Sequence, residues 1–220
     1  MRSTLTARPA LGLALIGLIG TTPISAQDTS PAHTHIGHVS DGFRGTPDRQ
    51  GLLPTAVAEA EIALRHATLA AGDASDLEGM QRHVGHVARA LDASTSESGP
   101  GLGYGVLVAA GRAAQHISLA ARSEGASDGV KAHATHIATA ANNAVTNAEA
   151  ALELASQIQE ATEASEAAEL LEELTALCEA ILNGVDADED GRTGWQEGEG
   201  GLSQATQHLT LLMRGEGLGG

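Results

Sequence analysis

HISLAARSEGASDGVKAHATHI, residues 116–137, reads as two helical stretches separated by a break at Glu124-Gly125. Residues 66–87, HATLAAGDASDLEGMQRHVGHV, align with this stretch at a constant offset of 50 and without a gap. Alanine matches carry little weight in an alanine-rich chain, whereas histidines in register carry more. The matched pairs are His66 with His116, His83 with His133, and His86 with His136. The repeat covers residues 54–92 and 104–142 and predicts two copies of one helical hairpin.

The composition favours an all-α fold. The 220 residues include one Phe, one Tyr and one Trp, so a core must be built from closely approaching helices rather than from aromatic-rich sheets. Two packed hairpins form a four-helix bundle with a pseudo-two-fold axis. We therefore expect such a bundle in residues 52–160, built from two 50-residue repeats, followed by a helix–loop–helix unit in residues 161–214.

The start of the chain resembles a secretory signal peptide over residues 1–26. Arg2 and Arg8 precede the apolar run Leu11–Gly20, and the small-residue ending Ile24-Ser25-Ala26 follows. About ten apolar residues rising 1.5 Å each cover only half of a ~30 Å hydrocarbon core, so a stable membrane anchor is not expected after cleavage. The mature protein is expected to be periplasmic or secreted.

Two further segments are expected to lack fixed structure. Residues 27–51 are polar and read as a flexible segment, and the glycine-rich residues 215–220 read as a disordered tail. The first of these segments contains His33, His35 and His38. They form a secondary candidate for metal capture, although a solvated polar tail is the reading that we favour.

The six repeated histidines are expected to lie in one layer of the bundle. In antiparallel helices, residues equidistant from the connecting turn lie at the same height. The midpoints of His66 and His83 (74.5), of His116 and His133 (124.5), and of His86 and His116 (101) all fall within glycine-containing breaks. Equal spacing therefore predicts that four helices bring imidazoles to one cross-section.

Such a layer has defined chemical uses. His83 with His86, and His133 with His136, are i,i+3 pairs whose side chains share a helix face. An all-imidazole cluster suits Zn²⁺, Cu²⁺ or Ni²⁺, whereas paired axial imidazoles suit haem b. The alternative is a structural or partner-binding bundle in which the histidines bond only to one another, to the backbone or to water.

Residues 186–197, DADEDGRTGWQE, follow the pattern Asp-x-Asp-x-Asp-Gly-x5-Glu and resemble an EF-hand calcium loop. The resemblance implies Ca²⁺ ligands at Asp186, Asp188, Asp190, Arg192 and Glu197, the fourth of these through its backbone carbonyl. Two departures from the family pattern stand out. Thr193 replaces the apolar residue that pairs with a partner loop, and residues 198–201 interrupt the exiting helix. We expect an unpaired site of moderate or weak affinity.

Several functions are disfavoured. A net charge of −16 argues against nucleic-acid binding, and the single cysteine, Cys178, excludes an intramolecular disulfide or a thiolate cluster. The chain has no nucleophile elbow, phosphate loop or His-Glu-x-x-His motif, so no enzymatic activity is expected. The sequence favours an exported protein that binds Ca²⁺ at the loop and a transition metal at the histidine layer. A haem-binding electron-transfer bundle and a metal-free structural bundle remain the alternatives, and no protein partner is assigned.

Overall fold

The computed structural model describes residues 30–219, and in this range the chain is helical without β-strands. The α-helices are α1 (Pro31–Ser40), α2 (Leu52–Ala70), α3 (Leu77–Leu91), α4 (Val106–Arg122), α5 (Asp128–Glu160), α6 (Ala164–Asn183) and α7 (Leu202–Gly215), with short 3₁₀ turns η1 (Pro47–Arg49) and η2 (Ala93–Thr95). The all-α prediction is confirmed. The predicted signal peptide, residues 1–26, lies outside the described residues. None of the helices in residues 30–219 is long and apolar enough to cross a membrane.

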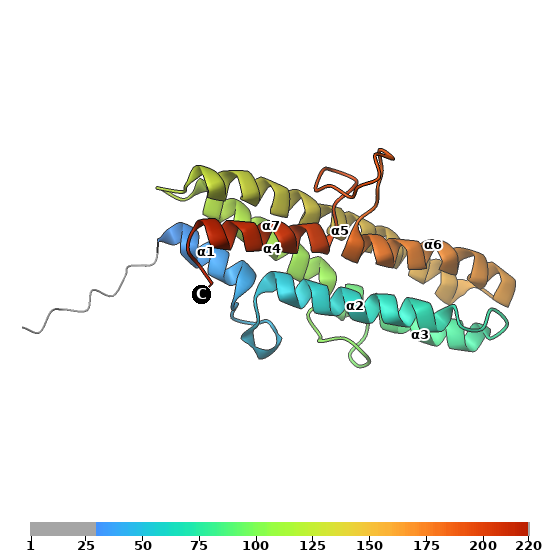
Figure 1. Ribbon diagram of the computed structural model, residues 1–220. Coiled ribbons are helices and arrows are strands. Elements are labelled where there is room, and N and C mark those ends of the chain that lie inside the picture. Colours follow the sequence, from blue (N-terminus) through green and yellow to red (C-terminus); the bar gives the residue numbers. More distant parts are fainter. Residues whose placement is uncertain (1–29, 220) are drawn as a thin grey trace, which may run out of the picture.

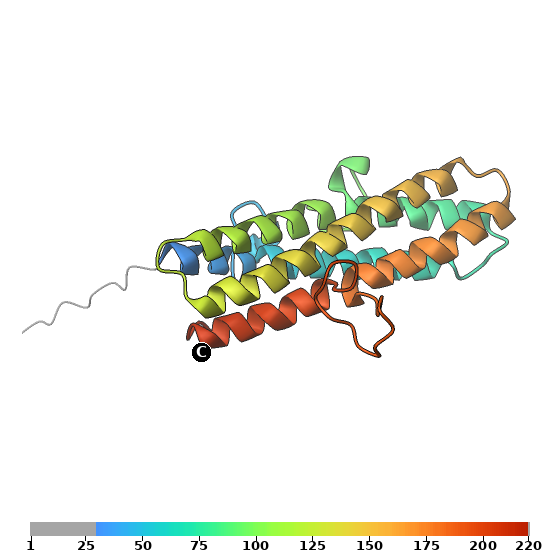
Figure 2. The same cartoon turned by 90° about the horizontal axis from the view of Figure 1, so that it is seen from above.

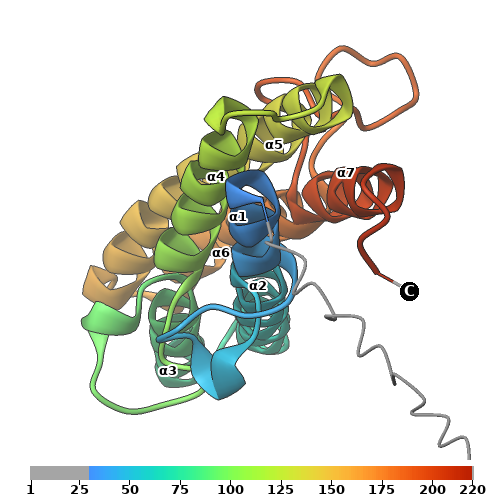
Figure 3. The same ribbon diagram turned by 90° about the vertical axis from the view of Figure 1, so that its left-hand side faces the viewer.

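The helices form one elongated bundle of four columns, three of which are interrupted along their length (Figures 1 and 2). In chain order the columns are α1 with α2, α3 with α4, the unbroken α5, and α6 with α7. Contacts between α2 and α3, α4 and α5, α5 and α6, and α6 and α2 close the square. Viewed along the bundle, α1, α4, α5 and α7 make one end (Figure 3).

Capping side chains set where several helices begin. The Ser30 hydroxyl accepts the N–H of His33, the Asp76 carboxylate accepts the N–H of Gly79, and the Ser127 hydroxyl accepts the N–H of Val130. Each cap satisfies one backbone donor that has no partner inside its helix. The predicted breaks therefore coincide with real helix starts after residues 76 and 127.

Alanine dominates the core and allows the columns to approach closely. On α2, Ala56, Ala60, Ala63 and Ala67 are at most 1% exposed, and their spacing of three to four residues places them on one face. Cys178 is buried on α6, and this burial raises the pKa of its thiol to about 12. The thiol is therefore protonated near neutral pH and shielded from solvent.

The four columns of the bundle are formed by different helices from those that we expected. We expected all four helices to come from residues 52–160, but α6 and α7 supply the fourth column instead of forming a separate unit. The reason is the length of α5, whose 33 residues extend past the end of α4. Its far half presents buried Ala148, Ala151, Ala155 and Ile158, and α6 packs along this half.

Both terminal segments that were expected to be irregular are instead tied into the fold. Within residues 27–51, α1 forms and buries Ile36 and Val39 completely. At the other end, the Glu216 carboxylate accepts the Ser127 hydroxyl and lies 2.9 Å from His33 Nε2, while Leu218 packs against the core. For residues 30–51 and 215–219, these contacts contradict the predicted flexible segment and disordered tail, because each segment has an apolar face or a charged side chain that packs or pairs with the bundle. Residues 27–29 and 220 lie outside the described residues.

One buried carboxylate holds the connection between α3 and α4. Glu59 on α2 is 0% exposed, and its carboxylate accepts the backbone N–H groups of Leu102, Tyr104 and Gly105, each at 2.9 Å. The connection is therefore fastened to the neighbouring column by a single side chain. A Cβ added at Gly105, whose φ is +79°, would lie 2.9 Å from the Leu91 carbonyl oxygen, so there is no space for a side chain there.

We predict that Glu59→Ala lowers the free energy of unfolding by roughly 2–4 kcal/mol, because three backbone donors lose their acceptor at a buried position. Urea unfolding followed by circular dichroism measures this change. Glu61→Ala, at an exposed position of the same helix, is the matched control and should leave the midpoint unchanged. Equal midpoints for the two variants would contradict the role assigned to Glu59.

Candidate metal sites

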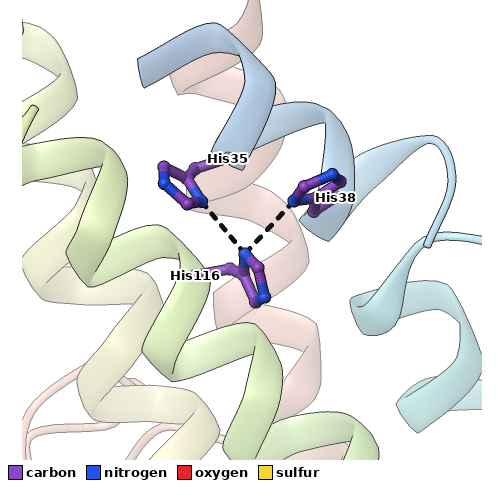
Figure 4. Close-up of side chains that lie close together, drawn as sticks. All are labelled: His35, His38 and His116. Carbon is purple, nitrogen blue, oxygen red and sulfur yellow. Dashed lines mark hydrogen bonds between the residues drawn. The ribbon is translucent and has the colours of Figure 1, made fainter. Parts of the chain in front are cut away.

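Nine of the ten histidines gather in three clusters within the described residues. The first triad is His35, His38 and His116; the second is His66, His83 and His86; the third is His133, His136 and His208. In each triad, one ring nitrogen from every member lies within 4.8 Å of the other two. The first triad is drawn in Figure 4.

The three triads share one design. An i,i+3 pair on one helix meets a single histidine on a neighbouring helix, and we call this single histidine the hub. The helices are α1 and α4 in the first triad, α3 and α2 in the second, and α5 and α7 in the third. In every triad the hub Nδ1 is the atom that approaches both Nδ1 atoms of the pair. The distances are 3.0 and 3.3 Å from His116, 3.1 and 3.4 Å from His66, and 3.1 and 3.3 Å from His208.

A simple sequence rule places these histidines at the edge of the core. Each of the nine is followed directly by an apolar residue that is at most 5% exposed: Ile36, Val39, Ala67, Val84, Val87, Ile117, Ala134, Ile137 and Leu209. One residue corresponds to about 100° around a helix, so each imidazole lies beside the core rather than inside it. The rings are consequently partly buried and line the seams between columns.

A metal ion accounts for the three-way contacts at each hub better than hydrogen bonding does. A ring nitrogen carries in its plane either one N–H or one lone pair, so it takes part in one strong hydrogen bond. Each hub Nδ1 nevertheless has two Nδ1 neighbours within 3.4 Å. A single cation accepts lone pairs from all three nitrogens at once, whereas one proton on the hub can serve both neighbours only through a weaker three-centre hydrogen bond.

The spacing also fits a metal ion. With metal–nitrogen bonds of 2.0–2.1 Å and tetrahedral angles, ligand nitrogens lie about 3.3–3.4 Å apart. The six hub distances of 3.0–3.4 Å fall at or slightly below this value. Three imidazole ligands leave the fourth position of a tetrahedral ion for water or another exchangeable ligand.

The environment favours the neutral form of six of these imidazoles. Burial, followed by repulsion from neighbouring histidines, lowers the pKa of six members of the triads. They are His35, His66, His86, His116, His136 and His208. Because only the unprotonated ring nitrogen binds a metal, these lowered pKa values favour the ligating form near neutral pH.

The prediction of one layer of six histidines is wrong. His66, His83 and His86 do meet, as the equal-height argument requires, but His116 and His133 belong to different triads. Equal distance from a turn sets the height of a residue and leaves its direction around the helix axis open. His116 faces α1, whereas His133 faces α7, so residues at matching positions of one hairpin point to different neighbours.

One histidine of the triads was not predicted from the sequence, and the prediction for three others was wrong. His208, the hub of the third triad, was not a candidate, and His35 and His38 belong to an ordered site rather than to a solvated tail. His33 lies outside the triads, with its Nε2 2.9 Å from Glu216 Oε2. One signal in the sequence could have identified His208. An apolar residue directly follows every histidine of the triads, and Leu209 follows His208 in the same way. A second signal was the alternation of pairs and single histidines along the chain, which leaves the last pair in need of a partner.

The geometry does not favour the haem alternative. Two axial ligands lie on opposite faces of the haem iron, so their nitrogens are about 4 Å apart with the porphyrin between them. The Nδ1 atoms in each triad instead converge from neighbouring helices, with hub distances of 3.0–3.4 Å.

The acidic loop gathers three of its five predicted calcium ligands. Carboxylate oxygens of Asp186, Asp188 and Asp190 lie within 4.8 Å of one another and are exposed. The Asp190 N–H donates to both other carboxylates at 3.1 Å, and the Arg192 N–H donates to Asp190 Oδ1 at 2.8 Å. Gly191 has φ +86°, as the sharp turn requires.

Glu197 does not join this acidic group. It lines a cavity of about 440 Å³ on α5 together with Asn142, Asn143 and Asn147. The chain after Glu197 turns through residues 198–201 before α7 begins at Leu202, so no helix directly follows the loop to carry Glu197 toward the aspartates. The two-oxygen ligand implied by the EF-hand resemblance is therefore missing from this arrangement.

Comparisons with known proteins add no assignment to these sites. No protein-family model matches the chain, and no curated protein or solved structure matches it significantly.

Proposed function

We propose that this chain is an exported metal-binding protein that holds one transition-metal ion in each histidine triad. The observation that carries the proposal is repetition. The same pair-and-hub geometry, with Nδ1 contacts of 3.0–3.4 Å, occurs three times on three different helix pairs. Histidines that were merely polar surface residues would have no reason to converge through the same atom in each case.

The donor set points to Zn²⁺, Cu²⁺ or Ni²⁺. Three neutral imidazoles are borderline ligands, which these ions prefer over the oxygen donors that suit Mg²⁺ or Ca²⁺. An open fourth position and partly exposed rings allow an ion to enter and leave. The net charge of −16 raises the local concentration of cations around the protein.

Three equivalent sites suit capture, buffering or delivery of metal rather than catalysis. A catalytic centre requires one site that is shaped around its substrate, whereas stoichiometric binding gains directly from each additional copy. We therefore propose a binding protein and no enzymatic activity. The signal-peptide resemblance of residues 1–26 supports a periplasmic or secreted location.

Calcium binding at the acidic loop is a second proposal. It is supported by the EF-hand pattern and by the convergence of Asp186, Asp188 and Asp190. Ca²⁺ requires six to eight oxygen ligands, and three carboxylates supply only part of this number. With Glu197 elsewhere, the remaining ligands are water and backbone oxygens, so a weak site is proposed.

The direct test is metal stoichiometry. Purified mature protein should bind three equivalents of Co²⁺, with the visible absorption of a four-coordinate ion, and Zn²⁺ should displace them. Weak Ca²⁺ binding should be additional and should not compete with Co²⁺. Equilibrium dialysis with elemental analysis gives the numbers of ions bound. Absence of tight Co²⁺, Cu²⁺, Ni²⁺ and Zn²⁺ binding would leave the metal-free structural bundle as the explanation.

A further inference from the structure

The third triad has a neighbour that the other two lack. The indole of Trp195 lies flat on the imidazole of His136, with ring centroids 3.8 Å apart and planes at 20°. At the first triad, Phe43 meets His38 and His116 edge-on, with centroids 5.4 and 5.2 Å apart. Among the aromatic contacts of the described residues, none joins Phe, Tyr or Trp to the second triad. The only tryptophan of the chain is thus stacked on a candidate metal ligand.

Trp195 belongs to the connection between α6 and α7, residues 184–201. This connection is fastened to α5 by Asn143, which is 9% exposed. The Asn143 amide donates to the carbonyls of Gln196 and Gly200 at 2.7 and 3.0 Å, and its carbonyl accepts the Gly198 N–H at 3.2 Å. The residues after Trp195 are therefore held on the helix that carries His133 and His136.

The earlier part of the connection has weaker links to the bundle. Asp186, Asp188, Asp190 and Arg192 are exposed, and the hydrogen bonds of the acidic group run within the loop itself. Trp195 lies between this exposed half and the half that Asn143 holds. The stack on His136 is consequently a link between the exposed half of the loop and the third triad.

We infer that Trp195 is a positioning residue for the third triad, and that a metal ion bound there orders the loop that carries Trp195. This inference rests on the proposed transition-metal binding. A flat stack restricts rotation of the His136 ring and keeps its Nδ1 directed at the hub, His208, 3.3 Å away. Less freedom is then lost when the ion binds, so the third triad binds its ion more tightly than the same triad without the indole.

The effect of Trp195 on metal binding and the effect of bound metal on Trp195 must be equal. If the stacked position of Trp195 strengthens metal binding by some factor, bound metal must favour the stacked position by the same factor. Partners outside the first coordination shell typically change metal affinity by about 10- to 100-fold. Metal binding at the third triad should therefore protect the loop to a measurable degree.

The affinity test uses the full mature chain with His66→Ala and His116→Ala, which leaves only the third triad complete. In this background, Trp195→Ala should weaken Co²⁺ binding by about tenfold. Trp195→Phe should retain most of the affinity, because a phenyl ring can also stack on His136. Leu211→Ala, at an exposed position of α7, is the matched control. Equal Co²⁺ affinity with and without the indole would overturn the inference.

The coupling test uses trypsin cleavage after Arg192 in the chain with all three triads. Saturating Co²⁺ should slow this cleavage about tenfold in the unchanged protein, and should not slow it in Trp195→Ala or His208→Ala. A small chromogenic peptide substrate added to the same reactions reports any direct effect of Co²⁺ on trypsin itself. Three bound Co²⁺ ions with unprotected Arg192 would overturn the inference and leave the proposed function intact. Absence of any Co²⁺ binding would overturn both.

Discussion

Replacing one hub histidine should remove one metal ion from the protein. In each triad both short Nδ1 contacts involve the hub, so His66→Ala, His116→Ala or His208→Ala leaves only two imidazoles from one helix. Removing a group that only contacts a metal ligand weakens metal binding by up to about a hundredfold. Removing a ligand itself should therefore weaken that site by more than about a hundredfold. The number of tightly bound Co²⁺ ions should fall from three to two in each single variant and to zero in the triple variant.

His33→Ala is the matched control for the hub variants, because His33 is the one histidine outside the triads. It should retain three ions although it loses the contact with Glu216. Circular dichroism before metal addition checks that each variant is folded. If one hub variant lost all three ions while remaining helical, the histidines would form a single site and the division into three triads would be refuted.

Acidification from about pH 7.5 to pH 5 should release the transition metals. Each bound ion must be replaced by protons on three imidazoles, so its affinity falls by up to about a thousandfold for each pH unit once all three rings titrate. Ca²⁺ held by carboxylates should remain bound until the pH approaches about 4. Co²⁺ absorbance followed during the titration measures the release, and retention of Co²⁺ at pH 5 would exclude histidine as the ligand.

The metal-free protein should also lose stability as the pH falls below 6.5. The pKa values of six triad histidines are lowered in the folded state, so the unfolded chain binds protons first. Wherever the unfolded state binds more protons, the free energy of unfolding decreases with falling pH. These histidines therefore leave the folded state unpenalised well above pH 6.5 and favour the unfolded state progressively as the pH falls below it.

Urea unfolding of metal-free protein between pH 7.5 and pH 5 measures this slope. The triple hub variant, with His66, His116 and His208 replaced by alanine, should show a shallower slope. This variant lacks three of the six histidines whose pKa values are lowered. It also removes the charge repulsion that these three exert on the remaining histidines of their triads. A stability that rises on acidification would contradict the lowered pKa values.

Much of the helical architecture could be predicted from local sequence. The breaks near residues 72–75 and 124–127 carry glycine and capping residues, and helices begin directly after them. The i,i+3 pairs were visible because a helix places such residues on one face whatever surrounds it. The meeting of His66 with His83 was also predictable, since a short hairpin leaves little choice of neighbour.

The order of the columns could not be predicted in this way. The length of α5 decides it, because a 33-residue helix needs a different partner at each end and takes α4 at one and α6 at the other. The partners of His116 and His133 follow from that choice. Neither the contact with α1 nor the contact with α7 is encoded near those residues.

The local sequence pattern determines only part of the geometry of the bundle. Sequence spacing specifies which residues are helical, which share a helix face and how far each lies from a turn. It leaves open the rotation of a helix about its axis and the column against which that face packs, because these depend on the total apolar surface that all helices must bury together. For this reason histidine could be predicted from the chain as the candidate metal ligand, whereas the division into three triads, with His208 included, emerged from the packed bundle.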